Sequence, residues 1–155
     1  MDDVLAQFAE SASNDLGRLL QGAALSMNTA VLTQLGQQGH PRIRPSHIAV
    51  FAGLDDSGTH ISVLAARAGI SRQAMGLVVR EVESLGYIQT ELDAADRRAT
   101  IVRLTDQGIA FCRLAIDISA EWNREVERLL GSADGDRLRD QLREITELFS
   151  RPRDA

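Results

Sequence analysis

Apolar residues recur at every third or fourth position over the first 35 residues, as in Phe8, Ala12 and Leu16. This spacing puts the apolar side chains on one face of a helix, so it predicts a long amphipathic helix from Val4 to Leu35. The next segment, Gly36 to Pro45, holds two Gly and two Pro residues, which predict the end of that helix.

A short helix and a turn are predicted next. Ser46 is of a type that caps helices, and the apolar positions after it predict a short helix that runs to about Leu54. The Asp-Asp-Ser-Gly sequence from Asp55 to Gly58 is typical of a turn.

Two further helices are separated by only three residues. Ser62 predicts the start of a helix over residues 63–68, and Gly69 can end it by adopting the left-handed conformation. Ser71 predicts the start of a second helix that runs to Leu85. Two helices joined by a turn from Gly69 to Ser71 have the spacing of a helix-turn-helix.

The hydrophobic period changes from helical to alternating after Gly86. Apolar and polar residues alternate over residues 87–92 and again over residues 99–104, which predicts the two strands of a β-hairpin. The six residues between them, 93–98, are polar, charged or small, so they predict a charged hairpin tip.

Two long helices are predicted at the C-terminal end. Thr105 can cap the first, whose apolar positions continue at helical spacing until Gly131 ends it. The second is expected over about Asp134 to Phe149. The pattern therefore predicts a mainly α fold with a small β-wing: a winged helix-turn-helix between long N- and C-terminal helices.

The distribution of charge makes DNA binding plausible despite a net charge of −5. Residues 1–40 carry one Arg and four acidic residues, residues 41–105 eight Arg and seven acidic residues, and residues 106–155 eight Arg and eleven acidic residues. Attraction to phosphates depends on local rather than total charge, so the central segment is the expected DNA-binding part.

A helix-turn-helix followed directly by a hairpin is expected to put its second helix in the major groove and its wing on the backbone or minor groove. Arg72 has the geometry to bind guanine O6 and N7, and Gln73 can bind adenine or a phosphate. Arg80, further along, either contacts a phosphate or is a solvent-exposed charge. The predicted DNA-binding residues of the helix are Ser71, Arg72, Gln73, Ala74, Gly76 and Arg80.

The wing tip supplies the other predicted contacts. Arg97 and Arg98 follow Asp96, which can hold a guanidinium or the turn backbone by hydrogen bonds. An arginine held in this way suits a narrow, negative minor groove. The competing interpretation, for these arginines as for Arg72, is a solvated surface charge.

The stretch from Leu64 to Gly108 resembles the MarR family of bacterial regulators, and the likeness extends over nearly the whole chain. Its most specific part is Asp-Arg-Arg at 96–98, together with its spacing from the Leu-Thr-x-x-Gly that ends at Gly108. Ala94 departs from the family, in which many members have Pro after the first wing Asp. The family's DNA-binding residues map onto Ser71, Arg72, Gln73, Gly76, Asp96 and Arg98.

The resemblance implies a homodimer that binds duplex DNA, with dimerisation helices in residues 1–40 and 106–155 and a DNA-binding lobe in residues 41–105. The apolar stripes on the long helices independently exceed what a wing domain can cover. A two-fold dimer predicts a pseudo-palindromic operator. The resemblance further implies a repressor that responds to a small aromatic or amphiphilic effector bound between the dimer helices and the lobe.

Other functions are less well supported. No phosphate loop, nucleophile elbow, metal cluster or acid–base pair predicts an enzyme or a cofactor. A winged helix that binds protein remains the alternative. An acidic or apolar second helix in the helix-turn-helix would favour it, but here that helix begins with Ser-Arg-Gln. With no membrane-spanning or signal-like segment and a single cysteine, the sequence predicts a cytoplasmic protein.

Several side chains allow a functional and a structural interpretation. Cys112 lies on an apolar stripe and is predicted to be a small buried residue rather than a redox sensor. Trp122 and Phe111 either line an effector pocket or, as is more usual at helical spacing, pack. The histidines His40, His47 and His60 are scattered, so they are predicted to be surface residues and not metal ligands.

Overall fold

A computed structural model describes residues 4, 14–93, 96 and 99–150 of the chain. Its contacts divide the chain into two compact units, Met1–Ala115 and Ile116–Ala155. The helices and strands are α2 (Leu16–Gln37), α3 (Pro45–Gly53), β1 (Thr59–His60), α4 (Ile61–Ala68), α5 (Arg72–Ser84), β2 (Ile88–Leu92), β3 (Thr100–Leu104), α6 (Asp106–Leu130) and α7 (Ser132–Ser150).

The prediction of one continuous helix from Val4 to Leu35 is wrong. Helix α2 begins at Leu16, after Asp15 in an extended conformation, and the Asp15 carboxylate accepts the N–H of Arg18 at 2.9 Å. An Asp side chain competes in this way with the helical hydrogen bonds of the backbone, which favours a helix start over a helix interior. The apolar period of the sequence continues across Asn14 and Asp15 and therefore concealed this helix start, whereas residues 5–13 of the predicted helix lie outside the described residues.

The starts predicted for two short helices are also wrong. Helix α3 begins at Pro45, not after Ser46, because proline suits the first helical position, where no N–H is needed. Helix α4 begins at Ile61, not after Ser62, because His60 belongs to strand β1 and leads straight into the helix.

The remaining caps confirm the sequence-based predictions. The Ser71 hydroxyl accepts the N–H of Ala74 at 3.1 Å at the start of α5, and Gly69 before it has a φ of +66°. The Thr105 hydroxyl accepts the N–H of Gly108 at 3.1 Å at the start of α6. Gly86 also has positive φ, at +85°, which ends the helix-turn-helix before the wing.

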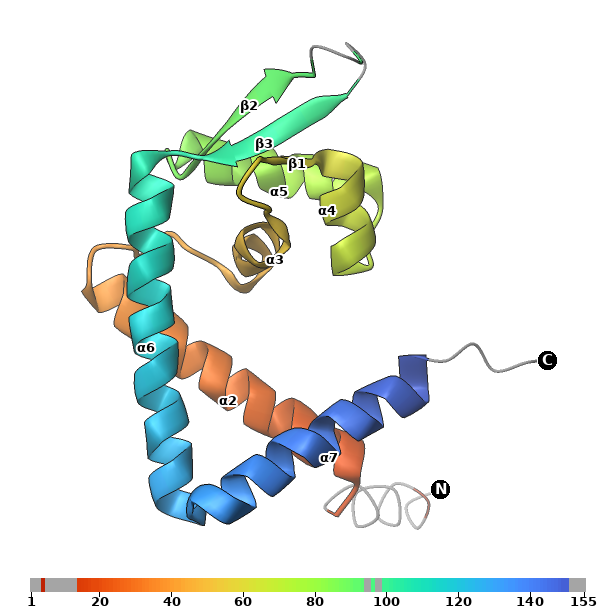
Figure 1. Ribbon diagram of the computed structural model, residues 1–155, viewed down its shortest axis with the longest axis vertical. Helices are drawn as coiled ribbons and strands as arrows, with labels where there is room; N and C mark the ends of the chain where they lie inside the picture. The colour runs from red at the N-terminus through yellow and green to blue at the C-terminus, as the bar shows by residue number, and fades with distance from the viewer. Residues whose placement is uncertain (1–3, 5–13, 94–95, 97–98, 151–155) are drawn as a thin grey trace, which may run out of the picture. The chain divides into compact units, whose positions relative to one another are not determined.

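The wing is a three-stranded antiparallel sheet with the strand order β1-β3-β2. The predicted hairpin is confirmed: Ile88 pairs with Leu104, and Leu92 pairs with Thr100. Strand β1, which pairs Thr59 with Val102, was not predicted, since two residues are too few to show an alternating pattern. Figure 1 shows this sheet beside α4 and α5 in the first unit.

The core of the first unit is made of apolar side chains from its helices and from the wing. An aromatic cluster joins three of these segments: the Phe111 ring of α6 lies 4.6 Å from Phe51 of α3 and 5.2 Å from Tyr87, measured between ring centroids. Phe111 is thus a packing residue, as predicted. The fully buried core side chains include Leu35, Val50, Leu64, Met75, Val79, Val82, Val102 and Phe111.

The second unit consists of the rest of α6 and of α7. Arg139 of α7 binds Glu127 of α6 at 2.7 Å and Asp136 of its own helix at 2.8 Å, which joins the two helices. Gly131, at φ +84°, makes the turn between them. Among the described residues, no helix is both long enough and apolar enough to span a membrane.

Candidate nucleic-acid interface

Helix α5 buries one face and exposes the other. Met75 and Val79 are buried in the core of the first unit, whereas Arg72, Gln73 and Arg80 are exposed. The spacing of these residues follows directly from the helical period, which separates the core face from the solvent face. The predicted contact residues at the start of α5 therefore lie together on its accessible side.

Arg72, Gln73, Gly76 and Arg80 line one shallow groove on the outer face of α5, together with Ile61 of α4. A Cβ atom at Gly76 would lie 3.7 Å from a guanidinium nitrogen of Arg80, so Arg80 extends back along the helix over this glycine. Neither Arg72 nor Arg80 has an ion pair within the described part of the chain. The groove thus presents two guanidinium groups available to an anionic partner.

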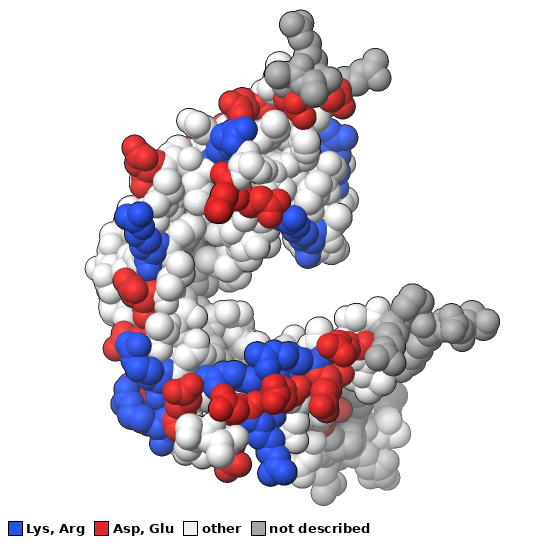
Figure 2. All heavy atoms as spheres, viewed as in Figure 1, with Lys and Arg blue, Asp and Glu red and all other residues white. Residues whose placement is uncertain are grey.

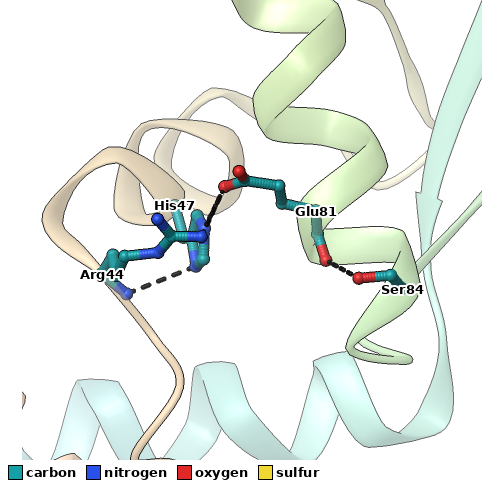
Figure 3. Close-up of polar contacts among 4 residues, drawn as sticks. All are labelled: Arg44, His47, Glu81 and Ser84. Carbon is teal, nitrogen blue, oxygen red and sulfur yellow. Dashed lines mark hydrogen bonds and ion pairs between the residues drawn. The ribbon is translucent and has the colours of Figure 1, made fainter.

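A charged cluster anchors the other end of α5 to α3 (Figure 3). The Glu81 carboxylate accepts from Arg44 at 2.9 Å and lies 3.1 Å from Nε2 of His47. The backbone N–H of Arg44 donates to Nδ1 of His47 at 3.3 Å. Because Nδ1 is an acceptor there, we assign the ring proton to Nε2, which donates it to Glu81.

His47 is completely buried, so the prediction that the histidines are surface residues is wrong at this position. A buried polar side chain needs hydrogen-bond partners, and here Glu81 and the Arg44 backbone supply them. The hydrogen bond from His47, with the charge of Arg44, lowers the pKa of the Glu81 carboxyl. Glu81 therefore stays ionised and holds α5 to α3.

A second carboxylate joins α5 to the wing. Oε1 of Glu83 accepts both the backbone N–H and the hydroxyl of Thr90 in β2, each at 2.7 Å. Helix α5 is thus tied to α3 by Glu81 and to strand β2 of the wing by Glu83. Neither link was found in the sequence, because each joins residues whose proximity depends on the fold.

Two further sets of contacts join the strands of the wing to one another and to the turn before β1. Arg103 of β3 binds Glu91 of β2 at 2.6 Å and also donates to the carbonyl of Ser57. His60 binds Asp93 at 2.8 Å across the end of the sheet. Acidic side chains border the grey tip residues in Figure 2, and acidic and basic side chains are mixed over the part of the lobe visible there.

The predicted tip contacts are only partly within the described structure. Asp96 is exposed, and its carbonyl accepts the N–H of Ala99 at 2.8 Å in the tip turn. Arg97 and Arg98 lie outside the described residues, so their predicted role stays a prediction.

The remaining candidate functional groups are the possible metal ligands and the Cys112 thiol. Within the described ranges, no group of three or more His, Cys, Asp or Glu side chains is placed to hold a metal ion. Burial raises the pKa of the Cys112 thiol, which favours its protonated and less reactive form. His40 contacts the Tyr87 hydroxyl at 2.6 Å and belongs to the aromatic cluster.

Comparison of the sequence with protein-family models and with curated proteins finds no match. Solved structures do match. The transcriptional repressor CouR bound to a 23-mer DNA duplex is 25% identical, with a TM-score of 0.67 over 86% of this chain and 94% of that one.

Two further solved structures match over similar lengths. A MarR-family transcriptional regulator from Rhodococcus sp. RHA1 is 25% identical, with a TM-score of 0.64 over 86% of this chain and 93% of that one. BpsR of Bordetella bronchiseptica, whose DNA binding is regulated by 6-hydroxynicotinic acid, is 19% identical, with a TM-score of 0.69 over 86% and 94%. The chain is therefore a winged helix protein with the fold of the MarR-family regulators.

Proposed function

We propose that this chain is a transcription regulator that binds specific sites in double-stranded DNA. The observation that carries the proposal is the outer face of α5, where Arg72, Gln73 and Arg80 line one groove on a capped helix beside a wing. The likeness to CouR, which was solved on a DNA duplex, supports it. A regulator of this kind would act in the cytoplasm and would need no catalytic group.

The start of α5 is the proposed base-reading segment. Ser71, Arg72, Gln73, Ala74 and Gly76 lie in its first turns, nearest the major groove in this mode of binding. A guanidinium at the groove suits guanine, and the absence of a side chain at position 76 permits close approach. Arg80 and the wing tip, Asp96 to Arg98, are proposed to contact the DNA backbone or the minor groove.

We further propose that the protein is a homodimer, with residues 1–40 and 106–155 forming the interface around the DNA-binding lobe of residues 41–105. Large apolar side chains on the long helices are exposed in the single chain, and burying them would favour association. They include Leu16, Leu19, Leu25, Ile116, Leu129, Leu148 and Phe149. A two-fold dimer would bind a pseudo-palindromic operator.

Repression released by a small aromatic or amphiphilic effector is the proposed regulation. CouR is a repressor, and the DNA binding of BpsR responds to an aromatic acid, which supports this mode for the same fold. An effector that binds the DNA-free conformation more tightly would lower the population able to bind the operator.

Selection from random duplexes, followed by fluorescence anisotropy with the selected duplex, tests the function. We expect tight binding at two subunits per site that resists random competitor DNA and weakens as salt rises. If selection enriches no sequence, the proposal is wrong, and a winged helix that binds protein becomes the better interpretation.

Replacing Arg72 by Ala is expected to weaken binding to the selected duplex by about 1 to 3 kcal/mol, because a bidentate contact to guanine would be lost. Binding to random DNA should change little. Arg42→Ala, at an exposed position outside the α5 groove and the proposed dimer interface, is the control and should leave both affinities unchanged. Equal losses of affinity for selected and random DNA would show that Arg72 contacts a phosphate instead.

Replacing Arg98 by Ala is expected to weaken binding to selected and random duplexes alike and to reduce the slope of log affinity against log salt by about one. Arg98→Lys keeps the charge and should keep the slope. The measurement is an anisotropy titration at several salt concentrations. An unchanged affinity of Arg98→Ala would exclude the wing contact.

A further inference from the structure

The side chains of His60 and Asp93 meet at the end of the wing sheet. Nε2 of His60 lies 2.8 Å from Oδ2 of Asp93, and the side chains are 39% and 19% exposed. His60 ends β1 and precedes the first turn of α4, whereas Asp93 directly follows β2. Because β3 lies between β1 and β2 in the sheet, this contact joins the two outer strands across the end of the central one.

The position of His60 leaves its side chain available for this contact. His60 is the N-cap residue of α4, yet its side chain makes no capping hydrogen bond. Ser, Thr, Asp and Asn are the usual residues there, because their short side chains reach the first backbone N–H groups of the helix. The imidazole instead reaches Asp93, so the residue that joins β1 to α4 holds the residue that follows β2.

Asp93 is the point at which the tip begins. Its backbone N–H donates to the carbonyl of Ala99 at 3.0 Å, and the N–H of Ala99 donates to the carbonyl of Asp96 at 2.8 Å. These two bonds close the base of the tip. The His60 contact adds a side-chain link from the same residue to α4, so the tip base is held from within the hairpin and from the helix.

We propose that His60 is a positioning residue for DNA binding, which acts by holding Asp93 and hence the base of the wing tip against α4. This inference rests on the proposed function, since the tip carries the predicted contact residue Arg98. A tip base that is already ordered loses less conformational entropy when the arginines engage DNA, which strengthens binding without a new contact. His60 itself need not touch the DNA.

Two substitutions of His60 separate this role from helix capping. The Nε2 amide of Gln occupies nearly the position of the histidine Nε2, so His60→Gln can keep the contact with Asp93. His60→Asn is too short to reach Asp93, although Asn is the better N-cap residue. A positioning role predicts that Gln preserves function and Asn impairs it, whereas a capping role predicts the reverse.

The first measurement needs no DNA. Amide hydrogen exchange of Asp93 and Ala99 should be about two- to five-fold faster in His60→Asn than in the unaltered protein, as expected for the loss of a partly exposed pair. His60→Gln should exchange at nearly the unaltered rate. An unchanged exchange rate in His60→Asn would overturn the inference, whatever the DNA measurements show.

The second measurement is affinity for the selected duplex in a double-mutant cycle. His60→Asn should weaken binding about two- to five-fold in the unaltered protein and have almost no effect when Arg97 and Arg98 are both already Ala, because its role passes through the tip arginines. Equal losses in both backgrounds would overturn the role in positioning. Failure of the unaltered protein to select any duplex would instead overturn the proposed function, and the exchange rates would still test the contact.

Discussion

Replacing Phe111 by Ala is expected to lower the free energy of unfolding of the protein by about 3 to 5 kcal/mol. The side chain is only 1% exposed, and its ring contacts those of His40, Phe51 and Tyr87. Truncation would leave a cavity between α6, α3 and the segment that leads into the wing. Urea denaturation followed by circular dichroism, at one protein concentration, measures the change.

Two control variants test whether the loss of stability comes from the lost buried volume. Phe111→Leu keeps much of the buried volume and should cost clearly less than the alanine variant. Leu92→Ala removes an apolar side chain that is 67% exposed and should change stability by no more than about 0.5 kcal/mol. If Phe111→Ala were as mild as Leu92→Ala, the aromatic cluster would not be part of the core of the first unit.

The parts of the fold that were predicted correctly have local signals. Ser71 and Thr105 cap their helices with their own hydroxyl groups, and Gly69 and Gly86 adopt positive φ at the ends of theirs. Each of these features depends on a residue and its near neighbours in the chain, so the sequence contains all the information required. The helix-turn-helix and its hairpin could therefore be recognised without a structure.

One error arose where distant residues decide the local conformation. His60 starts α4 in place of the predicted Ser62 because Thr59 and His60 pair with β3, some forty residues later in the chain. The start of α3 has a local cause instead, because Pro45 suits the first helical position and places the helix start one residue before Ser46. At α4, capping propensity was the correct local rule, but strand pairing selected a neighbouring position.

The candidate DNA-binding face of α5 could be predicted from the sequence, but the contacts that hold α5 in place could not. Arg72, Gln73 and Arg80 share the outer groove of α5, as helical spacing requires once Met75 and Val79 are buried. Glu81 and Glu83, which tie α5 to α3 and to β2, showed in sequence only as charges on a helix. The pairing of His47 with Glu81 would have indicated the link between α3 and α5. The two residues are 34 positions apart in the sequence, so nothing in the sequence suggested that they were in contact.

Replacing Gly108 by Ala is expected to destabilise the protein by about 3 kcal/mol or more, the upper range for overpacking. A Cβ atom there would lie 2.0 Å from the carbonyl oxygen of Tyr87 and 3.0 Å from a side-chain carbon of Leu104. Backbone cannot yield as a flexible side chain does, and this carbonyl also accepts the N–H of Thr105 at 3.1 Å. The start of α6 would have to move away from the segment that leads into the wing.

Gly22→Ala is the matched control, because Gly22 is also inside a helix but a Cβ atom there would meet no atom of the described residues of its own chain within 4 Å. Alanine at this position should stabilise the protein by up to about 1 kcal/mol through its higher helix propensity. The two variants make the same chemical change and are expected to shift the urea midpoint in opposite directions. Stabilisation by Gly108→Ala would mean that α6 does not approach Tyr87 closely, and the junction between the wing and α6 would then differ from the one described.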